Sequence, residues 1–552
     1  MPLRAYQSQC LDKSLERYRA GVNRQLCVMA TGLGKAILFA TLRSHHGFEK
    51  RVMVLVHREE LAAQAADKIH HWNPGLLVGV EMARSRTRGM DTHVVASVPT
   101  LGRHNSERLK QFDPAGFDCI VSDEAHHSTS PQWARVLNYF GLMSPGGSIL
   151  SLGLTATPNR SDGIGLRKCF DEIVYDMGID AGIHEGFLVD LRCWRISTKT
   201  TLDAVRTTAG DFNEGDLAKT VNTPERNGMI VKAWAQHAWD KKSLVFTANI
   251  QHALDLAEAF KALGVAAAAV WGDDPDRSEK LRKHRAGTEL LVLCNCAVLT
   301  EGYDDPNIQC IVLARPTKSS LLLTQMIGRG TRMPEGCQHM SELGENGKFD
   351  CIILDVVDTT SKHQLCTVPS LLGLPAQIDL RGKTYKEAKN RIERVAAEFP
   401  TANLADLRDL EKLDYLATQF SLFTVKYPPE IERLTELSWR KQGDGYVLPV
   451  KRERLTLARD LRDEWWVRGT LNGKLVEIHA QNLAGAFNVA DREVMDSGGE
   501  QRQLVLRNAR WHDQRPTDKQ LGLCRKLNLL VPAEATRGMV SAALDAKLRR
   551  EA

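Results

Sequence analysis

The sequence has no apolar run long enough to span a bilayer, and no apolar signal-peptide core follows its first residues. Its twelve cysteines are scattered, which is not the spacing of a disulfide framework. The pair Cys294-Asn295-Cys296 has no second pair to complete a zinc site. We therefore expect a cytoplasmic protein with no membrane partner and no zinc centre.

Net charge is also small, at +5 for 552 residues, so the molecule as a whole is not a polycation. Any contact with nucleic acid must then come from local basic patches. The length predicts several domains, and the hydrophobic fraction of 43% is that of an ordinary globular protein.

Two sets of short apolar runs alternate with helix-like segments. The runs are rich in Val, Ile and Leu and do not alternate in polarity, which is typical of parallel strands buried on both faces. The sequence therefore predicts two tandem α/β domains with parallel sheets. The first set is 26–30, 52–56, 93–96, 119–122 and 149–154, and the second is 243–246, 266–270, 290–293, 311–313 and 351–354.

After about residue 360 this rhythm stops, and a smaller α+β region is expected. Asn472-Gly473 indicates a hairpin turn, and the polar stretch 198–224 is expected to be irregular. Helices are predicted at 383–397, 517–528 and 537–550, and short antiparallel strands at 446–450, 455–461, 465–470 and 474–479. The predicted boundaries are 1–190, 191–223 (connector), 224–360, 361–440 (mainly helical), 441–515 (β-rich) and 516–552 (a helical pair).

A phosphate-binding loop is predicted at 30–36, between an apolar run and a helix. Gly32 and Gly34 let backbone N–H groups approach phosphate oxygens, and Lys35 supplies a charge for the β- and γ-phosphates. The next position normally carries Ser or Thr, whose hydroxyl binds Mg²⁺, but here it is Ala36. The loop predicts nucleotide binding, and the alanine leaves hydrolysis in question. The alternative for the loop alone is a tight turn with a surface lysine.

A pair of carboxylates, Asp123 and Glu124, follows the apolar run 119–122. Carboxylates at the carboxyl end of a parallel strand lie where doubly wound sheets bind ligands. Asp123 can hold Mg²⁺, and Glu124 can polarise a water for attack on the γ-phosphate. The alternative is a solvated acidic strand end. With the phosphate loop upstream, the pair predicts a site for ATP and Mg²⁺.

At this point the chain resembles the superfamily 2 DEAD/DEAH-box (DExH) helicases, which have two RecA-like domains with ATP between them and nucleic acid across their tops. Residues 4–7 are similar to the adenine-reading segment, 298–304 to motif V and 325–332 to motif VI. The resemblance implies catalytic roles for Glu124, Gln325, Arg329 and Arg332. It implies nucleotide binding by Arg4, Gln7, Thr31, Gly32, Leu33, Gly34, Lys35, Ala36, Gly302 and Asp304.

Four further motifs of the resemblance concern the nucleic-acid path and its coupling to ATP. They are 56–61 (motif Ia), 97–100 (Ib), 155–158 (III) and 245–247 (IV). For any single threonine among them the alternative is a local backbone cap. The resemblance implies nucleic-acid contacts for His57, Arg58, Thr100, Thr247 and Thr300, and coupling roles for His126, Thr155 and Thr157.

Arg329 and Arg332 have support from chemistry as well. They lie three apart at the end of a predicted helix, so they share a face. Guanidinium groups suit a phosphoryl group that gains charge in the transition state. Because they belong to the second domain, they reach ATP only when the cleft closes, which would link hydrolysis to domain motion. The alternative is a pair of arginines bound to the protein's own carboxylates.

The C-terminal third places tryptophans among basic residues. Aromatic rings beside cations could stack bases and contact phosphates, and the alternative is the core of a small β domain. Trp465 and Trp466 must point to opposite faces of a strand. A nucleic-acid or protein partner for this region stays open. The residues are Trp439, Trp465, Trp466, Trp511, Lys451, Arg452, Arg454, Arg468, Arg507 and Arg510.

The predicted function is an ATP-dependent DNA helicase or translocase that acts in repair, recombination or replication on single-stranded or branched DNA. The compact core and the residues 300–304 most resemble the RadD/UvsW-type DNA helicase group. Two alternatives remain. One is a nucleotide-gated nucleic-acid clamp that hydrolyses weakly because Ala36 lacks a hydroxyl, and the other is an RNA helicase. A third explanation for Ala36 is deliberate replacement, to trap the ATP-bound form.

Overall fold

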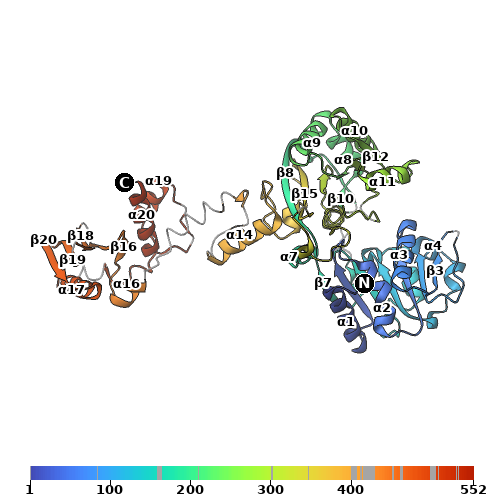
Figure 1. The fold of residues 1–552 in the computed structure, drawn as a ribbon, viewed down its shortest axis with the longest axis horizontal. Helices are drawn as coiled ribbons and strands as arrows, with labels where there is room; N and C mark the ends of the chain where they lie inside the picture. The colour runs from blue at the N-terminus through green and yellow to red at the C-terminus, as the bar shows by residue number, and fades with distance from the viewer. Residues whose placement is uncertain are drawn as a thin grey trace. The chain divides into compact units, whose positions relative to one another are not determined.

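The described residues of this computed structural model form three large sheets and one two-stranded ribbon (Figure 1). Its contacts divide it into two compact units, Met1–Arg391 with Ala405–Asp409, and Ile392–Leu404 with Leu410–Ala552. In the part of the chain described, no helix is long and apolar enough to cross a membrane. The structure describes residues 2–83, 85–157, 165–208, 210–299, 302–345, 347–398, 404, 407–410, 413, 429–450, 453–460, 464–497, 505–507, 509–529, 531–532 and 534–551.

The first sheet is seven-stranded and wholly parallel. Because β6 lies between β1 and β5, the residues that follow these three strands meet at one edge of the sheet. Its order is β3 (Val78–Glu81), β4 (His93–Ser97), β2 (Arg51–Val56), β5 (Phe117–Asp123), β6 (Leu150–Thr155), β1 (Arg24–Met29) and β7 (Glu172–Met177).

The second sheet has six parallel strands and its own core. Two parallel sheets in tandem confirm the predicted pair of RecA-like domains. The order is β12 (Ala267–Val270), β13 (Val292–Asn295), β11 (Ser243–Phe246), β14 (Cys310–Leu313), β15 (Asp350–Thr359) and β8 (Asp190–Thr201).

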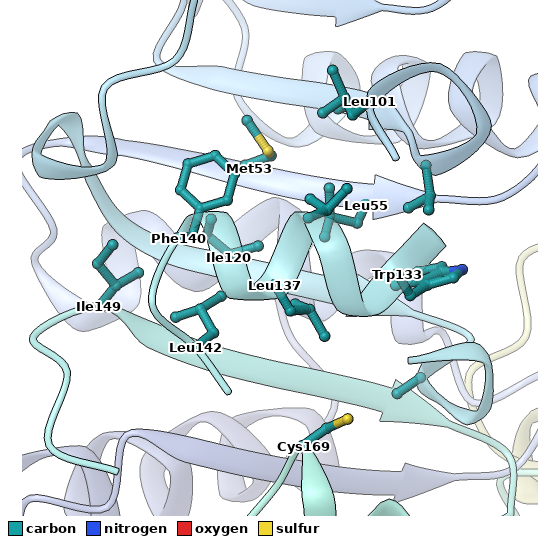
Figure 2. Close-up of a cluster of buried hydrophobic side chains, with 14 of the residues drawn as sticks. Met53, Leu55, Leu101, Ile120, Trp133, Leu137, Phe140, Leu142, Ile149 and Cys169 are labelled. Carbon is teal, nitrogen blue, oxygen red and sulfur yellow. The ribbon is translucent and has the colours of Figure 1, made fainter. Parts of the chain in front are cut away.

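Amphipathic helices cover these sheets, and α6 (Pro131–Tyr139) shows how. Trp133, Val136 and Leu137 repeat at helical spacing and are buried in one cluster with Met53 and other strand residues. Figure 2 shows α6 lying along the strands with Trp133 and Leu137 in this cluster. The other helices of this unit are α1 (Ala5–Arg19), α2 (Lys35–His46), α3 (Glu59–Trp72), α4 (Val98–Leu101), α5 (Glu107–Lys110), α7 (Ile179–His184), α8 (Glu214–Val221), α9 (Pro224–His237), α10 (Ile250–Ala262), α11 (Arg277–Ala286), α12 (Ser320–Ile327), α13 (Val368–Leu371) and α14 (Tyr385–Glu398).

The stretch 198–224, expected to be irregular, is largely regular. It holds the end of β8, the ribbon of β9 (Thr207–Thr208) and β10 (Asp211–Phe212), and helix α8. Leu202, Phe212 and Leu217 help to form a small core of their own there. The expectation was wrong because few, widely spaced apolar residues suffice to anchor a ribbon and a short helix against a larger domain.

The second unit is built on a five-stranded antiparallel sheet. The predicted hairpin turn is confirmed, because Asn472 (φ +53°) and Gly473 (φ +73°) both adopt the left-handed conformation between two paired strands. Its elements are α16 (Pro429–Leu434), β16 (Arg440–Gln442), β17 (Gly445–Val450), β18 (Glu453–Arg459), β19 (Trp465–Leu471), β20 (Lys474–Ala480), α17 (Leu483–Asp496), α19 (Asp518–Lys526) and α20 (Arg537–Glu551).

Two of the C-terminal tryptophans form core. Trp439 and Trp465 are buried in one cluster, and the Trp439 indole N–H donates to Asp491 Oδ1 at 3.0 Å. Trp466 lies on the opposite face of β19 and is half-buried, with the Arg468 guanidinium 4.8 Å from its ring centroid. The predicted opposite orientation of Trp465 and Trp466 is therefore confirmed. Lys451 and Arg452 lie outside the described residues.

A buried histidine makes the second domain sensitive to acid. Burial, and after it the charge of Arg226, lower the pKa of His252 from 6.5 to about 3. The Ala248 N–H donates to its Nδ1, so a proton there would face a donor. Between the folded pKa of about 3 and the unfolded value of 6.5, His252 binds a proton in the unfolded protein but not in the folded one. The free energy of unfolding therefore falls as pH falls through this range. From about pH 7.5 to 5.5, we expect this residue to raise the opening equilibrium of α10 about tenfold.

Hydrogen exchange of the α10 amides, corrected for intrinsic rates, measures that opening. His252→Gln should lose the tenfold component, whereas His104→Gln, at an exposed position of the first domain, should keep it. Equal acid sensitivity of wild type and His252→Gln would contradict the assignment.

Candidate ATP site

The predicted phosphate loop connects β1 to α2 at the edge of the first sheet. Gly32 (φ +96°) and Gly34 (φ +77°) adopt a conformation that other residues rarely take. A Cβ on Gly34 would lie 2.7 Å from the Gln7 amide nitrogen, so a side chain there would displace the Gln7 amide. Backbone amides at a helix start and a bare glycine surface suit phosphate oxygens, so the loop fits the nucleotide that the sequence predicts.

The predicted adenine-reading segment contacts this loop directly. The Tyr6 hydroxyl and the Gln7 amide both donate to the Leu33 carbonyl, at 2.9 and 3.2 Å. Gln7 Oε1 accepts from the Arg4 N–H at 3.0 Å, and the Arg4 guanidinium reaches the Cys337 carbonyl of the second domain at 3.5 Å. If the Gln7 side chain moved when nucleotide bound, its hydrogen bonds to Leu33 of the loop and to the Arg4 backbone would both change.

The phosphate-loop lysine and the acidic motif face each other. Lys35 Nζ lies 3.6 Å from Glu124 Oε1, with the two side chains only 11% and 13% exposed. Glu124 has a φ of +51°, which is a strained conformation for a residue with a side chain. Strain of this kind is typical of functional sites, and here it turns the carboxylate back toward the loop.

Asp123 sits deeper than Glu124 at the end of β5. Burial, and then the negative charge of Glu124, raise its pKa from 3.8 to about 6, while the charge of Lys35 acts in the opposite direction. At neutral pH the group is still ionised, so it fits the predicted Mg²⁺ ligand. Ala36 lies in the first turn of α2 and adds no oxygen, so the donor set is one hydroxyl short.

The three residues predicted to couple the ATP site to the strand path lie together. His126 Nδ1 is 3.4 Å from Glu124 Oε2 and 3.5 Å from the Thr155 hydroxyl. That hydroxyl donates to the Thr157 carbonyl at 2.9 Å. A series of contacts therefore leads from Glu124, the predicted catalytic carboxylate, to the end of β6. Pro158 lies outside the described residues.

His127 lies beside this series of contacts, and the sequence did not predict a role for it. Its ring centroid lies 4.2 Å from that of His126 and 4.5 Å from that of His57, which belongs to motif Ia. Three imidazole rings thus connect the predicted nucleic-acid side to Glu124. The doubled histidine after Asp123-Glu124-Ala125 was the available signal.

Motif VI of the second domain packs against the phosphate loop. A Cβ on Gly328 would lie 2.6 Å from the Thr31 Cβ, and one on Gly32 would lie 3.2 Å from the Arg332 Cγ. The Val189 N–H also donates to the Thr331 carbonyl at 2.9 Å, where the chain passes between the domains. Residues from both domains therefore line the same site, as the resemblance implies.

Both predicted arginines bind one carbonyl oxygen. Arg329 and Arg332 donate to the Tyr303 carbonyl at 2.8 and 2.9 Å. Arg332 also forms an ion pair with Asp304 at 2.5 Å, and Gln325 is buried on α12. The arginines thus bind the protein's own oxygen atoms, and Arg332 also lies beside Gly32 of the loop.

The structure does not bring the residues predicted to contact nucleic acid together as it does those of the ATP site. His57 and Arg58 follow β2. The Thr100 hydroxyl accepts from the Ala83 N–H at 3.2 Å, and the Thr247 hydroxyl donates to the Asn295 carbonyl at 2.9 Å. Both hydroxyls therefore bond to backbone groups of other segments of the chain. Thr300 lies outside the described residues. The nucleic-acid contacts stay a prediction.

A contact between the domains near motif V was also missed. The Gln64 side-chain amide, on α3 of the first domain, donates to the Gly302 carbonyl at 2.7 Å. Gly302 has a φ of +78°, which favours glycine at this point of the turn. Gly302 and Asp304 thus face α3 and Arg332, respectively, and their predicted contact with nucleotide stays a prediction.

Two family models match the chain. Residues 1–160 match the "Type III restriction enzyme, res subunit" family, and residues 226–334 match the "Helicase conserved C-terminal domain" family. The matched segments hold the phosphate loop and acidic motif in the first case, and motifs V and VI in the second.

Relatives of known name extend the likeness over the whole chain. A Schizosaccharomyces pombe protein named as a mitochondrial ATP-dependent helicase, irc3, is 31% identical over 99% of this chain and 90% of its own length. The ATP-dependent helicase IRC3 of Saccharomyces cerevisiae is 34% identical over 70% of this chain and 56% of its own. A solved fragment of an HsdR subunit of a type I restriction enzyme from Vibrio vulnificus YJ016 has 21% identity and a TM-score of 0.46, covering 66% of this chain and 70% of that one.

Proposed function

The chain belongs to the superfamily 2 ATP-dependent helicases of the irc3 family, and from this membership we propose that it is a motor that acts on DNA. In this proposal ATP hydrolysis between the RecA-like domains drives movement on DNA or its remodelling, in repair, recombination or replication. The observation that carries it is the junction of Gly328 and Arg332 with Thr31 and Gly32, which places motif VI on the phosphate loop.

The polar residues around this junction each have a chemical task in this proposal. The loop amides and Lys35 bind the phosphates, and Glu124 takes a proton from the attacking water. Arg329 and Arg332 stabilise charge that develops on the transferred phosphoryl group. Asp123 would hold Mg²⁺, which when bound supplies positive charge to the β- and γ-phosphate oxygens.

Retained hydrolysis fits the site better than the clamp does. Lys35 and Glu124 lie 3.6 Å apart, and Arg332 lies beside Gly32 of the loop and shares the Tyr303 carbonyl with Arg329, which supports an assembled set of catalytic groups other than Ala36. A protein that only gates on nucleotide would have no use for Glu124 in a strained conformation. We infer that a water occupies the place of the missing hydroxyl.

DNA is the favoured nucleic acid because one matched family is named for a restriction enzyme, a class that acts on DNA. The resemblance of residues 300–304 to the RadD/UvsW-type group points the same way. A protein partner for the C-terminal unit is a further part of the proposal, as is the domain division at 441–515 and 516–552.

For the compartment, we propose a reducing environment. All twelve cysteines are free thiols, and most are buried. The cytoplasm and the mitochondrial matrix both fit this chemistry. The S. pombe relative is named mitochondrial, so cell fractionation decides between the two.

Ala36→Thr should raise ATP turnover about tenfold or more, because the new hydroxyl restores one metal contact. Turnover of both forms should rise with single-stranded or forked DNA. The measurement is steady-state ATP hydrolysis without nucleic acid, with each DNA and with RNA of the same sequence. Ala262→Thr, exposed at the end of α10, is the matched control and should change nothing.

The outcomes separate the candidate functions. No turnover in either form, with ATP-dependent DNA binding intact, would support the clamp and overturn the motor. Stimulation by RNA alone would overturn DNA as the substrate in favour of the RNA helicase.

A further inference from the structure

The carbonyl that holds both arginines belongs to Tyr303, whose side chain is anchored on the opposite side. The ring is buried, and its hydroxyl lies 3.0 Å from His284 Nδ1 and 3.2 Å from Asp305 Oδ2. His284 Nε2 lies 3.1 Å from the Ser243 carbonyl, which can only accept, so this nitrogen carries the proton. Nδ1 is then an acceptor, and the phenol O–H donates toward it and Asp305.

A buried ion pair closes this anchor. Lys242 Nζ lies 2.6 Å from Asp305 Oδ2 and donates to the Arg285 carbonyl at 2.8 Å. Asp305 is completely buried, so its charge depends on Lys242 and on the phenol. The anchor therefore ties the segment after Gly302 to β11 and α11, whose residues make no predicted contact with ATP.

The backbone on either side of Tyr303 has contacts of its own. The Gly302 carbonyl accepts from the Gln64 side-chain amide at 2.7 Å, and the Asp304 carbonyl accepts from the Arg285 guanidinium at 3.2 Å. The buried Tyr303 side chain adds the hydroxyl contacts of the anchor, which help to set the orientation of the Tyr303 peptide. Its carbonyl oxygen must in turn lie where the Arg329 and Arg332 guanidinium groups can both reach it.

We propose that Tyr303 is a positioning residue for ATP hydrolysis, which acts by placing its own carbonyl so that Arg329 and Arg332 are held together beside the phosphate loop. His284, Asp305 and Lys242 support it. This rests on the proposed function, because it presupposes that the two arginines act in hydrolysis. None of the supporting residues touches the nucleotide in this scheme.

Tyr303→Phe removes the hydroxyl alone and tests the inference. We expect kcat for DNA-stimulated ATP hydrolysis to fall about tenfold, the scale of one lost buried hydrogen bond, with KM for ATP changed less than about twofold. In an Arg332→Ala background the same substitution should cost less than the tenfold loss expected with Arg332 present, because only its effect through Arg329 remains. Tyr139→Phe, whose hydroxyl donates to the Phe112 carbonyl far from this anchor in the sequence, is the matched control.

His284 provides a second variant of the same anchor. His284→Asn keeps an acceptor near the phenol and should retain more activity than His284→Leu, while a role in folding alone would give no such rescue. Hydrogen exchange of β11 confirms that each variant is folded before its kinetics are compared.

The outcomes separate this inference from the proposed function. If Arg332→Ala leaves kcat unchanged, the role of the arginines fails. If Arg332→Ala lowers kcat but Tyr303→Phe does not, only the positioning role fails. Full multiplication of the two defects in the double variant also overturns it, because the residues would then act independently.

Discussion

Glu124→Gln is expected to lower ATP turnover by about a hundredfold to ten-thousandfold, the range for loss of a general base, while ATP binding is kept. Glutamine has nearly the same shape as glutamate but cannot accept the proton of the attacking water. Lys35, 3.6 Å away, keeps its place in the loop and still binds phosphate. The variant should therefore bind nucleotide and DNA but fail to turn over.

The measurement is steady-state ATP hydrolysis beside equilibrium binding of a fluorescent ATP analogue. Glu107→Gln, at an exposed position on α5, is the matched control and should leave both unchanged. Turnover within about threefold of wild type would show that Glu124 is not the base, because even the weakest general-base contribution exceeds that factor. Loss of analogue binding would show instead that Glu124 shapes the loop.

Arg226→Met is expected to destabilise the second RecA-like domain by about 3–5 kcal/mol, the cost of leaving one partner of a buried ion pair alone. Arg226 donates twice to Asp358, each bond 2.9 Å, and the side chains are 1% and 0% exposed. A third bond runs to the Ala314 carbonyl at 2.9 Å. The pair thus ties α9 to the ends of two central strands.

The double variant Arg226→Met with Asp358→Leu should be more stable than Arg226→Met, because no uncompensated charge remains. Hydrogen exchange of the α9 and β15 amides measures the loss. Arg206→Met is the matched control and should change stability little, since the Arg206 side chain that pairs with Asp216 is 76% exposed. A double variant no more stable than Arg226→Met would mean that shape, and not the charge, sets the cost.

The sequence predicted the buried strands of the two parallel sheets well, but of their edge strands it predicted only β12. Strands such as β2 and β11 are apolar after their first residue, as is typical of strands covered by helices on both faces, and their runs stand out. β3, β7 and β8 lie at sheet edges, where burial alternates with exposure, so no continuous run marks them. The 198–224 stretch was misjudged for a related reason, since α8 and the ribbon need only a few apolar anchors.

The site divides in the same way. Lys35, Asp123 and Glu124 were predictable because each follows directly from a strand end, so local sequence fixes its place. The Tyr303 carbonyl and the Gln64 amide were not, because backbone oxygens and contacts between domains leave no pattern of residue types. The two threonines, Thr100 and Thr247, show the same limit, since only the fold reveals which partner a hydroxyl takes.

Because Gly328 has no side chain, motif VI can approach the phosphate loop closely, and a substitution at this position would push the two apart. With Thr31 so near, even a methyl group there would act as a wedge between the two halves of the ATP site. The spacing across this junction is thus set by the close approach of the Gly328 backbone to the Thr31 side chain. A steric limit of this kind would let motif VI and the phosphate loop return to the same relative position in each catalytic cycle.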